Sequence, residues 1–140
     1  MGYLKVISSI RSENGFENLP ILIHGYDYVY PYPWHDDNRD PKYAKNNEWL
    51  GEPLDFREIY DKNLRRNILK FLIDQLYELM DDLAGNSNKT GVYVVDCRGA
   101  MPNLTDWNDE IHGTSEGYAN VKARFSETLA RAIDNDILTS

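Results

Sequence analysis

Apolar positions along the chain follow two different periods, and the alternation between them predicts an α/β order of elements. Three aliphatic side chains share one face of residues 3–12, which predicts a short helix there. Pro20 leads into a compact apolar run, Ile21 to His24, that we interpret as a buried strand. Tyrosines at every second position from Tyr26 to Tyr32 predict that the extended segment continues beyond this run.

The clearest helical pattern covers residues 58–84 and ends at Gly85, a residue typical of helix C-termini. We expect its apolar stripe to face the core: Leu64, Ile68, Leu72, Leu76, Leu79 and Leu83, widened by Phe71 and Met80. A continuous apolar run within residues 91–96 predicts a second strand, of the parallel-sheet type. Residues 114–134 predict a last helix, capped by Thr114 or Ser115. Its expected inward positions are Tyr118, Val121, Phe125, Leu129 and Ile133.

This alternation predicts one α/β domain over residues 1–140, with a parallel sheet between helices. Only two strands are predicted, whereas parallel sheets usually contain more strands and have both faces covered. We therefore expect the chain to be part of a larger domain, or to complete its sheet through a partner chain, including a second copy of itself. It should self-associate or expose a strand edge. Residues 31–57 show no sustained period and predict a long loop or lid.

Composition excludes several classes of partner. The net charge of -8 argues against nucleic acid and anionic membrane surfaces, and no apolar run is long enough for membrane insertion. The first residues lack the pattern of a secretion signal, so the default expectation is a cytoplasmic protein. A single cysteine, Cys97, forms no internal disulfide, and we interpret it as a small buried residue.

The most informative chemistry lies directly before the last predicted helix, in the spacing Asp109-x-x-His112. A carboxylate at this distance can orient an imidazole, which a general base in acyl transfer requires. Asp106 and Glu110 are rival acids, less favourably spaced for reaching the ring. The alternative is a polar loop that caps the helix, without catalysis. Asp96 and Arg98 are expected to pair at the end of the second strand.

The stretch from Asp96 to Tyr118, which contains WNDEIHGTSEGY, resembles the last conserved block of the SGNH hydrolases, or GDSL-type esterases. The earlier run ILIHGYDY, residues 21–28, is similar to a subgroup of the same family. The resemblance implies a three-layer, flavodoxin-like α/β/α fold, with His112 as general base and Asp109 as the acid that orients it. One departure is Gly113, which stands where the family usually has Pro.

The other departure concerns the nucleophile, because the Gly-Asp-Ser block and the oxyanion-hole blocks of that family are not found. Ser8, Ser9 and Ser12 lie in a helical pattern, and Ser115 is explained by helix capping. The chain therefore resembles the C-terminal portion of such a domain and lacks its N-terminal strands. We predict that this chain alone is inactive and that the intact domain hydrolyses a small-molecule or acylated ester. The alternative is a non-catalytic module of the same fold that binds a ligand or partner.

Two further groups complete the candidate site. The resemblance and the loop position suggest binding residues beside the pair: His24, Tyr26, Asp27, Trp34 and Trp49. His24 and Asp27, with His35, Asp36 and Asp37, are also side chains that metals favour, but their spacing matches no metal motif. We interpret them as a strand end and a solvated acidic loop, and predict neither a metal nor a cofactor.

Overall fold

The computed structural model describes residues 2–45 and 49–139, with side chains described as far as residue 134. Its elements are, in chain order, α1 (Gly2–Arg11), β1 (Ile21–His24), α2 (Pro41–Ala44), α3 (Gly51–Phe56), α4 (Lys62–Ala84), α5 (Ser87–Thr90), β2 (Val92–Val95), the 3₁₀ turn η1 (Leu104–Asp106) and α6 (Ser115–Thr139). The predicted alternation of helices and strands is confirmed, and the protein is of the α/β class.

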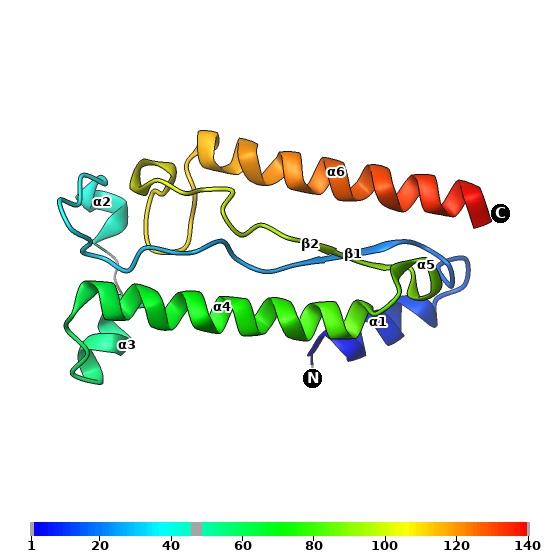
Figure 1. Cartoon of the computed structure of the whole chain (residues 1–140), viewed down its shortest axis with the longest axis horizontal. Coiled ribbons are helices and arrows are strands. Elements are labelled where there is room, and N and C mark those ends of the chain that lie inside the picture. Colours follow the sequence, from blue (N-terminus) through cyan, green and yellow to red (C-terminus); the bar gives the residue numbers. More distant parts are fainter. Residues whose placement is uncertain (1, 46–48, 140) are drawn as a thin grey trace.

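The two strands pair in parallel, with Ile21 opposite Val92 and His24 opposite Val95. They lie between α6 on one side and α4 with α1 on the other (Figure 1). Both strands run toward the end of the molecule where α2 and α3 lie, and both long helices start there (Figure 1). In open parallel sheets this carboxyl edge is where binding and catalytic residues gather.

Beyond β1 the predicted continuation of the strand is wrong. The strand pairing ends at His24. Beyond it, the two chain segments are joined by hydrogen bonds to the buried carboxylate of Asp27. Asp27 is 2% exposed and accepts the backbone amides of Gly99 and Met101, both at 2.5 Å. The segment after β1 is thus joined to the segment after β2 through a side chain.

The predicted boundaries of the other elements need three corrections. The stretch 31–57 contains two short helices, α2 and α3. Helix α4 begins only at Lys62, where Asp61 accepts the amide of Leu64 at 2.7 Å as its N-cap. Gly85 follows its last residue with a φ of 52°, as expected for a helix end. The last helix begins at Ser115 and is longer than the pattern indicated.

The predicted inward stripe of α4 is the largest error. The buried positions of this helix are Arg65, Ile73, Tyr77, Met80 and Ala84, which cover the sheet. Of the predicted stripe, Met80 is buried and Ile68, Leu76 and Leu83 are half-buried, as expected. Leu64, Leu72 and Leu79 are exposed instead, at 50%, 55% and 67%. The apolar face of α4 is wider than the two-stranded sheet. Part of this face therefore extends past the strands and stays exposed.

The predicted inward face of α6 is also partly exposed. Thr128 and Ala132 are buried, whereas Tyr118, Leu129 and Ile133 are each close to half exposed although they were predicted to point inward. In the described part of the chain β1 has no strand on its second edge. The expected exposed strand edge is present in the described residues, and α4 and α6 beside it carry exposed apolar side chains.

We expect the 140-residue protein to associate in a concentration-dependent manner through these surfaces. Introducing charge with Leu72→Asp and Leu79→Asp should shift it to the monomer with little loss of stability, because both side chains are exposed. Sedimentation velocity over a range of concentrations measures this shift. Asn67→Asp, at an exposed polar position of the same helix, is the matched control and should behave as wild type. A wild-type protein that stays monomeric at every concentration would contradict the expectation.

Candidate functional site

The segment after β2 forms a tight loop whose two ends meet in an isolated antiparallel bridge between Trp107 and Gly113. Trp107 is buried and its indole N–H donates to the carbonyl of Met101 at 3.1 Å. The Asn108 side chain donates to the Gly113 carbonyl at 3.0 Å, and its amide donates to the His112 carbonyl at 2.8 Å. The loop that carries the acid and the base is therefore closed by its own backbone.

Within this loop Asp109 and His112 are in direct contact. The ring Nδ1 of His112 lies 2.8 Å from Oδ2 of Asp109, while Oδ1 accepts the amides of His112 at 2.7 Å and Ile111 at 2.9 Å. The Asp109 side chain is 17% exposed and that of His112 is 56% exposed. A half-buried acid thus holds an imidazole that faces solvent.

The protonation of the pair follows from its surroundings. Burial by itself raises the pKa of the Asp109 carboxyl, but the two amides and the His112 ring outweigh it and lower the pKa below its ordinary value. An ionised carboxylate accepts only, so Nδ1 of His112 carries the proton and donates it. Among the described residues no partner lies within hydrogen-bonding distance of Nε2. In the neutral ring this nitrogen carries a lone pair directed away from Asp109, which is the arrangement that a general base requires.

The two rival acids have other partners. Asp106 accepts the amide of Asn103 at 2.8 Å and completes the capping box of η1. Glu110 points into the interior and is fully buried. The contact with His112 is made by Asp109, as the spacing favoured.

The helix that follows is joined closely to this loop. Thr114 caps α6 by accepting the amide of Gly117 at 3.1 Å, and its own amide donates to the Asp106 carbonyl at 2.8 Å. A Cβ on Gly113 would lie 2.7 Å from the sulfur of Met101, and one on Gly117 would clash with the Asp106 carbonyl oxygen. Both glycines therefore permit the close approach of α6 to the loop.

The predicted binding residues lie in different places. His24, at the end of β1, packs edge-on against Phe125 of α6, with ring centroids 5.1 Å apart. Asp27 is buried and occupied by backbone amides. Trp34 is packed edge-on against Tyr30 at 5.3 Å, within the loop. His24, Tyr26 and Trp49 are exposed, and Tyr26 and Trp49 line one pocket together.

This pocket has a volume of about 320 Å³ and an almost entirely apolar wall. It lies between α4 and the loops at the carboxyl edge of the sheet. Its lining is formed by Tyr26, Val29, Trp49, Leu50, Leu69, Leu72, Ile73, Leu76 and Ile111. Because Ile111 directly precedes His112, the pocket adjoins the acid–base loop.

Two other predicted features can be placed. Asp96 and Arg98 pair at 2.7 Å, and Arg98 also contacts Asp74 at 3.0 Å, so the expected ion pair is confirmed. Cys97 is buried, and burial raises the pKa of its thiol. Among the side chains that the structure describes, no three from His, Cys, Asp or Glu gather closely enough to hold a metal ion.

The serines do not complete the pair in the described part of the chain. Ser8, Ser9 and Ser12 are exposed, in or just after α1. Arg11, beside them, donates to the carbonyls of Thr90 at 3.2 Å and Gly91 at 3.3 Å, near the amino ends of the strands. The end of α1 is therefore held at the edge of the sheet opposite to His112.

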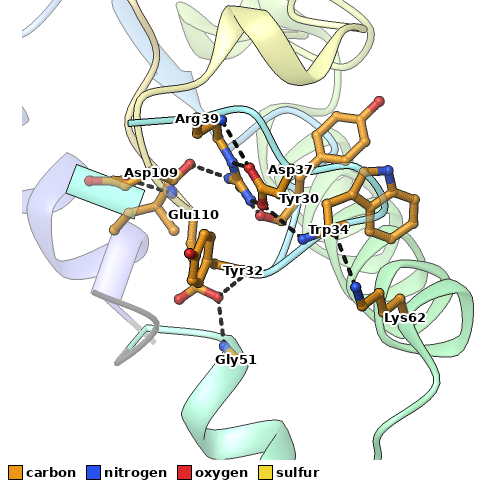
Figure 2. A network of polar contacts seen from close by, with 10 residues as sticks. Tyr30, Tyr32, Trp34, Asp37, Arg39, Gly51, Lys62, Asp109 and Glu110 are labelled. Atoms are coloured by element: carbon orange, nitrogen blue, oxygen red, sulfur yellow. Dashed lines mark hydrogen bonds and ion pairs between the residues drawn. The ribbon is translucent and has the colours of Figure 1, made fainter. Parts of the chain in front are cut away.

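Sequence reasoning missed a polar network beside the pair, drawn in Figure 2. Arg39 and Glu110 are both buried and reach the acid–base loop from within the fold. The sequence pattern did not predict these roles, because Glu110 contacts Tyr32 and Arg39 contacts Asp109, which are distant along the chain.

Comparison of the chain with protein-family models, with curated proteins and with solved structures finds no match. Of the helices in the described residues, none has both the length and the apolar character needed to cross a membrane.

Proposed function

We propose that this chain carries the acid and the base of an SGNH-type serine ester hydrolase, with the nucleophilic serine supplied from outside the chain. The observation that carries the proposal is the His112 ring, held at Nδ1 by a half-buried, ionised Asp109 and left open at Nε2. An Asp-His pair in this orientation is two thirds of the triad used in acyl transfer.

In the proposed reaction, Nε2 of His112 takes the proton of the serine hydroxyl as its oxygen attacks the ester carbonyl. The imidazolium then gives that proton to the leaving alcohol as the tetrahedral intermediate collapses to the acyl-enzyme. A water molecule repeats the sequence and releases the acid. Throughout, Asp109 stays ionised and stabilises the positive ring.

The architecture supports the same proposal at the level of fold. β1, α4 and β2 form a parallel unit with helices on both faces of the sheet. In the described residues each strand has one edge without a partner strand, and the helices on the two faces of the sheet, α4 and α6, carry exposed apolar side chains. Further strands added there would extend the unit toward a three-layer, flavodoxin-like fold.

A second candidate is a non-catalytic binding module. The apolar pocket beside Ile111, with Tyr26 and Trp49 at its wall, favours it, because pockets of this size and lining are typical of small-molecule sites. This candidate assigns no role to the open Nε2 of His112.

Turnover of p-nitrophenyl acetate separates the two candidates. We expect the 140-residue protein to hydrolyse the ester no faster than free imidazole at the same concentration, because no serine hydrogen-bonds to His112 among the described residues. A protein that also contains the serine-bearing segment, encoded in frame upstream or by a partner gene, should show saturable turnover. Saturable, serine-dependent turnover by the 140 residues alone would contradict the claim that the nucleophile lies elsewhere. Absence of turnover in the longer protein would favour the binding module.

A further inference from the structure

Glu110 places a carboxylate inside the fold where three backbone amides converge. Its Oε1 accepts the amides of Tyr32 at 2.8 Å and Gly51 at 2.7 Å, and its Oε2 accepts that of Leu50 at 2.8 Å. The side chain is fully buried. Figure 2 shows the Glu110 side chain between the loop at Tyr32 and the start of α3 at Gly51.

Arg39 approaches the same loop from another side. Its Nη1 donates to the carbonyl of Asp109 at 2.9 Å and to that of Tyr30 at 3.0 Å. The guanidinium is held in place by Asp37, at 3.0 Å from Nε and 2.6 Å from Nη2 (Figure 2). The carbonyl of Asp109 is therefore held by Arg39, whose own position is held by Asp37.

These contacts hold the peptide between Asp109 and Glu110 from both ends. Arg39 fixes its carbonyl, and the amides around Glu110 fix the side chain that follows it. The direction of the Asp109 side chain depends on this peptide, and the His112 ring depends on Asp109. A displacement of the loop between Tyr30 and Gly51 would thus be passed to the imidazole.

Burial of two charged side chains argues for a specific role. Buried ionic groups are often no more stabilising than apolar residues of the same size, so fixing a geometry is a reason to keep them. Burial raises the pKa of the Glu110 carboxyl, although the three amides and Arg39 act to lower it. Glu110 belongs to the acid–base loop and Arg39 donates to the Asp109 carbonyl in it, so the bonds of both residues join this loop to other segments.

We propose that Glu110 and Arg39 are positioning residues, which couple the loop from Tyr30 to Gly51 to the orientation of the Asp109–His112 pair. The same contacts join two residues that line the pocket, because Leu50 donates its amide to the Glu110 carboxylate and Ile111 directly follows Glu110. The catalytic meaning of this coupling rests on the proposed function, but the coupling itself does not.

The first test uses the unmodified protein and amide hydrogen exchange measured by NMR. If the contacts act as one unit, the backbone amides bound to Glu110 and those bound to Asp109 should open together. The protection factors of Tyr32, Leu50 and Gly51 should then lie within about tenfold of those of Ile111 and His112. Loop amides that exchange at the unprotected rate, beside protected amides of Ile111 and His112, would overturn the proposal.

The second test is Glu110→Gln, read through the exchange of the His112 Nδ1–H proton with water. A glutamine has a single acceptor oxygen, so at least one of the three amides loses its partner. We expect exchange to accelerate by about tenfold, the factor for one lost buried hydrogen bond. Glu127→Gln, at an exposed position of α6, and Val92→Ala, in the core at the far end of β2, should leave the rate unchanged.

A folded Glu110→Gln protein with the wild-type exchange rate would overturn the proposal. If that variant does not fold, the exchange pattern of the wild-type protein decides alone. Neither readout involves ester turnover. A coupled loop in a protein that never gains esterase activity would therefore refute only the proposed function.

Discussion

Replacing His112 by alanine should lower kcat/KM for p-nitrophenyl acetate by about 10⁶-fold in the protein that contains the serine-bearing segment. The ring is the only group in the proposed site that moves the proton between the serine and the leaving alcohol. Its side chain is 56% exposed, so its removal should not disturb the fold. Unchanged unfolding by urea would show that the loss is one of catalysis.

Asp109→Asn should lower the same quantity by about 10⁴-fold, because an amide that donates to Nδ1 favours the wrong tautomer of the ring. The matched control is Asp106→Asn, which alters the nearby acid that caps η1 and does not contact the ring. We expect less than about tenfold loss there. An Asp106→Asn protein as inactive as Asp109→Asn would reassign the acid, and a fully active His112→Ala protein would refute the mechanism.

Gly117→Ala should destabilise the protein by about 2–3 kcal/mol, although alanine normally stabilises a helix relative to glycine by about 1 kcal/mol. The reason lies in the close approach of α6 to the acid–base loop. An added Cβ would lie 2.8 Å from the Met101 sulfur and closer still to the Asp106 carbonyl oxygen. The sulfur can move aside, but the carbonyl belongs to backbone that accepts the Thr114 amide.

Urea unfolding followed by tryptophan fluorescence measures this effect. Gly2→Ala is the matched control, since a Cβ on Gly2 of α1 would have nothing within 4 Å. It should be neutral or slightly stabilising. A Gly117→Ala protein more stable than wild type would show that the loop and α6 are not packed as described. The clash should also displace His112 and reduce turnover in the complete hydrolase.

The parts that could be predicted from the sequence are those with short-range causes. β1 was located correctly because three aliphatic residues and His24 follow a proline, and α4 ends at Gly85 because glycine adopts the positive φ needed there. The contact between Asp109 and His112 was predictable since a separation of three residues brings the carboxylate and ring together in a turn.

The buried face of α4 could not be predicted in this way. Periodicity identifies an apolar stripe, but what covers the stripe depends on the rest of the sheet. In this chain Ile73 and Tyr77 cover the two strands, while Leu72 and Leu79 extend beyond them. The four-residue helix α2 also gave no periodic signal, because it is too short to repeat an apolar face.

The network around Glu110 was missed for a different reason. Its carboxylate meets the amides of Tyr32 and Leu50, which are 78 and 60 residues away along the chain. Because the donors are backbone amides, which every residue except proline has, the residue types at these positions do not indicate the contacts. Glu110 was weighed only as a rival to Asp109, and its burial was visible only in the folded structure.

Labelling with a fluorophosphonate tests most directly the claim that Asp109 and His112 serve a serine on another segment. The reagent reacts with serines activated by such a base, and mass spectrometry locates the modified residue. We predict no labelling of the 140-residue protein, and labelling of one serine outside it when the serine-bearing segment is present, dependent on His112. Labelling of a serine within residues 1–140, or labelling that survives His112→Ala, would contradict the account.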